Sequence, residues 1–172
     1  MTAADSDYLI RLASLSLSFV GFSSVVVTLR GALGGELSER HVRLVRLYIE
    51  GGFLVTALAL LPAMLGMLGV APAVAWPLAS AIAALIFSLV LVTQFRRRRA
   101  IEAGRFPFWV VVIYAVSVVA VLRLWLNVVG WPQPSGAGAY AVVLTWALGL
   151  FGFIFVRTIE LFLHRTPRRD GV

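Results

Sequence analysis

The chain has 172 residues, of which 60% are hydrophobic and 13% charged, and its formal net charge is +7. Soluble domains are about 45–50% apolar and about 25% charged, so this composition excludes an ordinary soluble fold and predicts a lipid bilayer as the solvent. With 15 arginines but no lysine and no cysteine, the chain also excludes thiol catalysis, iron–sulfur clusters and lysine Schiff bases.

Five apolar stretches are long enough to cross a bilayer, whose hydrocarbon core of about 30 Å takes about 20 helical residues. They are 12–30, 47–69, 74–95, 106–129 and 139–163. An uninterrupted apolar run in lipid satisfies its own backbone hydrogen bonds only as a helix. The sequence therefore predicts an all-α transmembrane bundle of five helices, with residues 1–172 forming a single membrane domain.

A four-helix alternative remains open at this stage. The stretch 12–30 contains several serines, which make it the least hydrophobic of the five. If it does not cross the membrane, four spans remain and the N-terminus lies on the cytoplasmic side.

Arginines fall in alternate connections between the apolar stretches. They follow 12–30, 74–95 and 139–163, whereas 69–73 and 130–138 contain no basic residue. Because arginine-rich short loops stay in the cytoplasm, we expect the N-terminus outside and the C-terminus inside. The same pattern argues against nucleic acid as a partner. The bias towards Arg, Ala, Gly and Val is typical of a GC-rich bacterial genome, which points to a bacterial cytoplasmic (inner) membrane.

The arginines beside the second and third stretches are candidate contacts for anionic lipid heads, each contributing about 1 kcal/mol near the surface. Glutamate–arginine pairs four residues apart, together with Ser38 as a possible N-cap, predict that the second helix begins before the membrane. The candidate lipid contacts are Arg40, Arg43, Arg46, Arg96, Arg97, Arg98 and Arg99.

Aromatic residues gather near both predicted membrane boundaries, where amphipathic rings anchor helices at the headgroups. The outer group comprises Tyr8, Trp76, Trp125, Trp131 and Tyr140. The inner group comprises Tyr48, Phe106, Phe108 and Trp109. We therefore expect two interfacial belts.

Small and hydroxylated side chains recur along the first stretch at helical spacing. One face carries Ser14, Ser18, Gly21 and Thr28, and Ser16 and Ser23 lie on roughly the opposite face. Because small residues let helices approach closely in lipid, the pattern favours a central helix packed on two sides. The alternative is a water-accessible path lined by the hydroxyls of the first face.

Four ionisable residues lie at membrane depth, where such groups are functional candidates. Glu50 enters the second stretch, and Arg157 and Glu160 lie near the inner end of the fifth. Similar depth and opposite charge suggest the hypothesis that Glu50 pairs with Arg157. The alternative is that both side chains reach the inner headgroups separately. Arg123 lies towards the outer face, where we expect it to meet phosphate heads.

Catalysis finds little support in the sequence, because no recognised catalytic, metal-binding or phosphate-binding motif is present. We expect no catalytic, cofactor-binding or metal-binding residue. The favoured function is a structural or interaction protein, or an accessory subunit, that forms homo-oligomers or binds another membrane protein. One alternative is a small channel or transporter using the polar face of the first stretch and Glu50. Another is a lipid-modifying enzyme built around His41 or Glu50.

Overall fold

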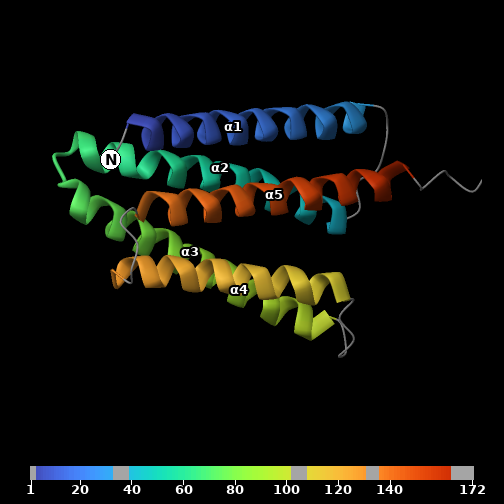
Figure 1. The fold of residues 1–172 in the computed structure, drawn as a ribbon. Helices are drawn as coiled ribbons and strands as arrows, with labels where there is room; N and C mark the ends of the chain where they lie inside the picture. The colour runs from blue at the N-terminus through green and yellow to red at the C-terminus, as the bar shows by residue number, and fades with distance from the viewer. Residues whose placement is uncertain (1–2, 33–38, 102–107, 131–135, 164–172) are drawn as a thin grey trace, which may run out of the picture. The chain divides into compact units, whose positions relative to one another are not determined.

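The computed structural model describes residues 3–32, 39–101, 108–130 and 136–163, and this part of the chain contains helices and turns without any strand. Figure 1 shows the helices in chain order. They are α1 (Ala3–Ala32), α2 (Glu39–Met67), α3 (Pro72–Ile101), α4 (Phe108–Val128) and α5 (Gly136–Leu163).

Each of the five helices is long and apolar enough to cross a membrane. This confirms the prediction of an all-helical chain with five candidate spans. The candidate span within α1, Asp5–Leu29, is more apolar on average than the one within α2. The first stretch is therefore not the least hydrophobic of the five, which removes the reason for expecting only four spans. α2 begins at Glu39 and α3 continues to Ile101, so both helices extend beyond their apolar stretches. Arginine and glutamate are good helix formers, and the backbone hydrogen bonds continue where the hydrophobic residues stop.

Packing divides the chain into two compact units, which are described separately. Unit 1 comprises Met1–Leu9 and Leu60–Leu144, and unit 2 comprises Ile10–Ala59 and Thr145–Val172. Unit 2 contains most of α1, the first part of α2 and the second part of α5. Unit 1 contains all of α3 and α4.

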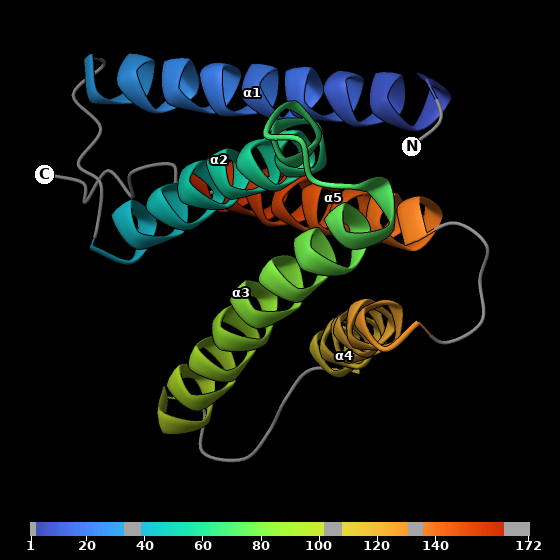
Figure 2. The same cartoon turned by 90° about the vertical axis from the view of Figure 1, so that its left-hand side faces the viewer.

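Two consecutive glycines let α2 approach its neighbours closely in unit 2. A Cβ added to Gly51 would collide with the ring of Phe151 on α5. One added to Gly52 would collide with Cγ2 of Val20 on α1. Figure 2 shows α1, α2 and α5 from a second direction. Small residues at such contacts maximise van der Waals packing, which replaces the hydrophobic driving force between helices in lipid.

Aromatic rings fill the space one turn along α2 from these glycines. The ring of Phe155 lies edge-on to that of Tyr48, with centroids 5.0 Å apart, and to that of Phe19 at 5.4 Å. The rings of Phe19 and Tyr48 are 6.3 Å apart. Edge-to-face pairs at these separations each contribute about 0.5–1.5 kcal/mol beyond area burial. The cluster therefore joins α1, α2 and α5 within unit 2.

In unit 1, α3 and α4 pack side by side and antiparallel. Phe95 stacks edge-on against Tyr114 at a centroid distance of 5.8 Å, and Asn127 of α4 reaches back to Ser80 of α3. Apart from Trp76, the buried residues of α3 are small, namely Ala75, Ala79, Ser80, Ala83 and Ala84. α4 has the smallest buried share of the five spans, 11% against 28–33%, so most of its surface is exposed.

We expect Gly52→Ala to destabilise the protein by about 1–3 kcal/mol, because the methyl group overpacks the contact with Val20. Gly149→Ala on α5 is the matched control, because nothing lies within 4 Å of the added Cβ. That change should be neutral or stabilising by up to about 1 kcal/mol, from helix propensity. Unfolding by SDS in mixed micelles, followed by tryptophan fluorescence, measures both. Equal stabilities for the two variants would contradict the close approach at Gly52.

Candidate functional site

The buried and exposed faces of α1 differ from the prediction of a helix packed on two sides. Ser16 and Ser23 are fully buried. The other face is exposed along its length, and it carries Ser14, Ser18, Gly21 and Thr28. A Cβ added to Gly21 would meet no atom within 4 Å. α1 is therefore packed through the Ser16–Ser23 face, and helical spacing alone could not show which of two small, hydroxylated faces is buried.

The exposed hydroxyl groups of α1 form hydrogen bonds with the backbone of their own helix. Ser14, Ser18 and Thr28 each donate a hydrogen bond to the carbonyl oxygen four residues earlier, at 2.9–3.0 Å. Such back-bonding is a common way for serine and threonine to occupy a helix surface. These groups therefore need neither water nor a partner helix to be satisfied.

The buried hydroxyls behave differently. Ser16 Oγ donates across to the carbonyl oxygen of Gly52 on α2, at 2.8 Å. Among the described residues, Ser23 Oγ and the Tyr48 hydroxyl have no hydrogen-bond partner, although both side chains are fully buried. A buried polar group without a partner costs about 1–3 kcal/mol. Among the described residues of unit 2, two buried hydroxyl groups therefore lack a hydrogen-bond partner, that of Ser23 on α1 and that of Tyr48 on α2.

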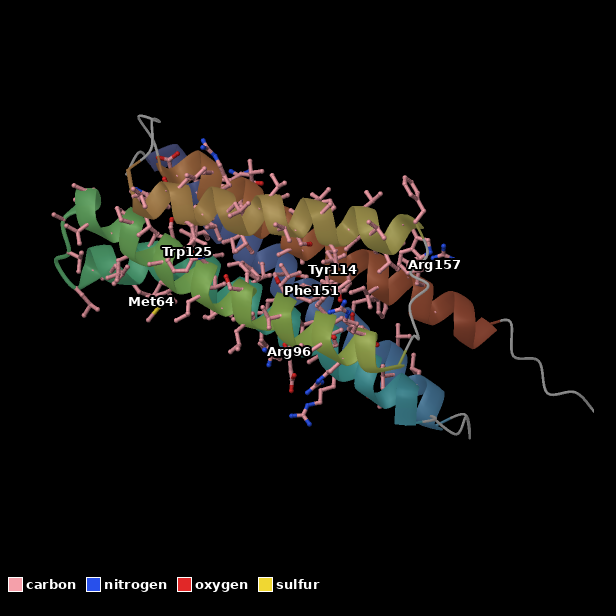
Figure 3. The ribbon with its side chains drawn as sticks, turned by 90° about the horizontal axis from the view of Figure 1, so that it is seen from below. Met64, Arg96, Tyr114, Trp125, Phe151 and Arg157 are labelled. Carbon is pink, nitrogen blue, oxygen red and sulfur yellow. The ribbon has the colours of Figure 1, made fainter. Side chains whose placement is uncertain are left out.

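The structure places Glu50 against Arg46 and not against the hypothesised Arg157. Arg46 Nε lies 2.5 Å from Glu50 Oε1, one turn back on α2, and both side chains are mostly exposed. The Arg157 guanidinium lies 5.8 Å from the centroid of the Phe153 ring on its own helix, near the end of the described part of α5 (Figure 3). The Glu160 side chain lies outside the described residues. Such an exposed pair within one helix contributes little to stability, because water screens the two charges.

Polar side chains hold the far end of α4 to α3. Asn127 Nδ2 donates to Ser80 Oγ at 2.7 Å, and Trp125 Nε1 donates more weakly to Ser88 Oγ at 3.4 Å (Figure 3). Arg123, one turn earlier, is half-buried and makes no ion pair with any residue that the structure describes. The sequence singled out Arg123 but missed the Asn127–Ser80 contact, because a single Asn and a single Ser have no characteristic spacing.

The arginines at the end of α3 are exposed. Arg96, Arg97 and Arg99 all reach the surface, and the Arg99 guanidinium lies 5.8 Å from the centroid of the Phe95 ring. Of the other candidate lipid contacts, Arg40 and Arg43 belong to the first turns of α2. Their side chains, like that of Arg98, lie outside the described residues.

The aromatic residues near the predicted boundaries divide into two kinds. Tyr8, Phe108, Trp109 and Trp125 are exposed, as interfacial anchors should be. Tyr48, Trp76 and Tyr140 are buried, and the rings of Trp76 and Tyr140 pack edge-on with centroids 6.0 Å apart. Those three are helix-packing residues and not the membrane anchors that their positions predicted. Trp131 and Phe106 lie outside the described residues.

No group of three or more histidine, aspartate or glutamate side chains that could hold a metal ion occurs among the described residues. His41 and His164 fall outside the side chains that the structure describes. Comparisons of the chain with protein-family models, curated proteins and solved structures find no match.

Changing each of the two buried serines of α1 to alanine should have opposite effects on the stability of the protein. Ser16→Ala removes the hydrogen bond to Gly52, and we expect a loss of about 0.5–1.5 kcal/mol. Ser23→Ala removes an unsatisfied hydroxyl, and we expect a neutral or stabilising change of up to about 1 kcal/mol. SDS unfolding in mixed micelles measures both. A clear loss of stability in Ser23→Ala would mean that this hydroxyl has a partner such as a buried water molecule.

A double-mutant cycle should detect the polar contact between α3 and α4. We expect Asn127→Ala and Ser80→Ala to be coupled by about 0.6–1.7 kcal/mol, the range for hydrogen bonds between membrane helices. Trp125→Phe with Ser88→Ala is the matched cycle, and its longer contact should give a smaller coupling. Additive effects of Asn127→Ala and Ser80→Ala would contradict the contact.

Proposed function

We propose that the protein is a multi-pass protein of the bacterial inner membrane that acts through helix packing, as a structural, interaction or accessory subunit. The proposed role involves neither transport of a solute nor catalysis of a reaction. The observation that supports this proposal most is that polar side chains at membrane depth make their hydrogen bonds within the protein. Ser16, Asn127 and Trp125 bond between helices, and the hydroxyls of the exposed α1 face bond to their own backbone.

The proposed orientation has the N-terminus outside and the C-terminus in the cytoplasm. Arginines in alternate connections support it through the positive-inside rule. The exposed tryptophans of α4 agree with a transmembrane path. Trp109 and Trp125 are 16 residues apart, about 24 Å along a helix, which approaches the thickness of the hydrocarbon core.

The partner in this proposal is a second membrane protein or a second copy of the chain. Large apolar side chains are exposed on every helix, among them Phe22, Leu85 and Val119. Lipid covers such surfaces in a bilayer, so they permit a partner helix without requiring one. α4 offers the largest exposed share of surface to either.

The transport alternative is supported by one observation, the unsatisfied hydroxyls of Ser23 and Tyr48. Water or a small polar solute would satisfy both groups. In this alternative the path would follow the Ser16–Ser23 face of α1, because the Ser14–Thr28 face is exposed on the outside of unit 2.

The absence of native cysteine allows a direct test with a membrane-impermeant thiol reagent in intact cells. We expect Ser23→Cys and Ser16→Cys to remain unlabelled, because a packed interface excludes water. Ser135→Cys and Gly104→Cys, in the outer and inner connections by our orientation, are the controls. The first should label in intact cells and the second only after lysis.

Rapid labelling of Ser23→Cys would favour the channel over the structural role. Labelling of Gly104→Cys but not Ser135→Cys in intact cells would reverse the proposed orientation.

A further inference from the structure

One end of the α3–α4 pair brings exposed arginines and exposed aromatic rings together. Phe95 contacts Tyr114, and the two helices run antiparallel, so the residues after Phe95 lie at the same end as those before Tyr114. Arg96, Arg97 and Arg99 follow Phe95, and Phe108 and Trp109 precede Tyr114. These residues are all exposed. We call Phe95, Arg96, Arg97, Arg99, Phe108 and Trp109 the arginine–aromatic end of α3 and α4. Figure 3 labels Arg96 of this end and, more than one helical turn beyond Trp109 on α4, Tyr114.

The length of α3 sets the depth of these side chains. α3 has 30 residues and is therefore about 45 Å long, about 15 Å more than a hydrocarbon core. Its long apolar stretch ends at Phe95, and the arginines begin at the next position. With the apolar part in the hydrocarbon, the guanidinium groups lie at the level of the lipid phosphates. Phe95 and Trp109 then lie at the boundary, where aromatic rings are favoured.

The described residues do not neutralise this charge. Between residues 51 and 159 the sequence contains a single acidic residue, Glu102, against Arg96, Arg97, Arg98, Arg99 and Arg105 in the same connection. Among the described residues, the guanidinium groups of Arg96, Arg97 and Arg99 form no ion pair. This contrasts with Arg46 on α2, which is paired with Glu50. Within the described part of the chain, these exposed guanidinium groups can therefore bind an anion from outside the protein.

Phosphate is the anion that this geometry favours. The planar guanidinium presents parallel N–H donors that match two phosphate oxygens. Arg96 and Arg99 are three residues apart and share one side of the helix, whereas Arg97 points in another direction. The end of α3 can thus engage more than one headgroup.

We propose that the arginine–aromatic end of α3 and α4 is a binding site for anionic phospholipid headgroups. The arginines bind the phosphates, and Phe95 and Trp109 pack beside the glycerol and upper acyl chains. This inference rests on the proposed membrane residence of the chain. It goes further by giving α3 a lipid preference that a helix merely following the positive-inside rule would not need.

Two single-tryptophan proteins test the site. One keeps only Trp109 and the other only Trp125, with the remaining tryptophans changed to Phe. Each is placed in phosphatidylcholine vesicles containing chain-brominated phosphatidylglycerol or brominated phosphatidylcholine, and the ratio of fluorescence quenching gives the relative binding of the two lipids. We expect the anionic lipid to be favoured roughly fivefold or more at Trp109, about one arginine–phosphate contact, with no preference at Trp125.

Two triple variants of the Trp109 protein provide the matched comparison. Changing Arg96, Arg97 and Arg99 to Gln should remove the preference. Changing Arg165, Arg168 and Arg169 to Gln removes the same number of charges from the C-terminal tail and should leave it intact. An equal loss in both variants would mean general charge attraction without a site, and would overturn the proposal.

The remaining outcomes distinguish a lipid headgroup from soluble phosphate as the bound anion. They also distinguish failure of the lipid site from failure of the proposed function. If inorganic phosphate at millimolar concentration abolishes the preference, the arginines bind soluble phosphate and the lipid site is wrong. Equal quenching by both lipids at Trp109 overturns the lipid site but leaves membrane residence intact. No quenching by either lipid at either tryptophan overturns the proposed function itself.

A second measurement covers the case in which the tryptophan replacements prevent folding. The chain with its native tryptophans is released from mixed phosphatidylglycerol and phosphatidylcholine micelles and examined by native mass spectrometry. Retained phosphatidylglycerol should exceed phosphatidylcholine, and the excess should fall in the Arg96, Arg97 and Arg99 triple variant. No excess in the native chain would overturn the site.

Discussion

The contact at Gly52 is the interaction on which unit 2 depends. Lipid tails are as apolar as leucine, so membrane helices gain little by burying apolar surface against one another, and close packing with hydrogen bonds takes its place. Gly52 supplies both: the absence of a side chain admits Val20, and its carbonyl oxygen accepts from Ser16 Oγ and Thr56 Oγ1 at 2.8 and 3.0 Å. Gly51 admits the Phe151 ring in the same turn. Three helices thus meet around one turn of α2.

Unit 1 applies the same physics with different residues. The buried residues of α3 are alanine and serine apart from Trp76, and Asn127 of α4 supplies the hydrogen bond to Ser80. α4 then exposes most of its length. It is the helix whose surface most resembles that of a lipid-facing span, with a tryptophan near each end. The arginine–aromatic end follows from this arrangement, because antiparallel packing brings the α3 arginines beside Trp109.

Polar groups in these helices are handled in three ways, and each has a different functional meaning. Ser14, Ser18 and Thr28 donate hydrogen bonds to the backbone of their own helix, so the hydroxyl groups on this exposed face are already satisfied. Ser16 and Asn127 bond between helices and fix packing. Ser23 and Tyr48 are buried without a partner among the described residues. Among the described residues of unit 2, these two hydroxyls are the buried side-chain groups that still lack a hydrogen-bond partner. Whether water reaches Ser23 therefore distinguishes a packing role from a transport role.

The sequence by itself determined the helical class, the order and the approximate limits of the apolar stretches, because an apolar run of span length leaves the backbone a single way to satisfy its hydrogen bonds. It left the choice between five and four spans open. It also indicated an N-cap at Ser38 and glutamate–arginine pairs four residues apart at the start of the second helix, since both depend on spacing within one helix. Contacts between helices were decided by the tertiary structure alone. Two hydroxylated faces of α1 have similar composition, and Tyr48, Trp76 and Tyr140 occupy positions suited equally to a membrane boundary or a buried contact. Which face is buried, and which aromatic ring meets lipid, depends on how neighbouring helices pack against it, and periodicity within one helix carries no information about that neighbour.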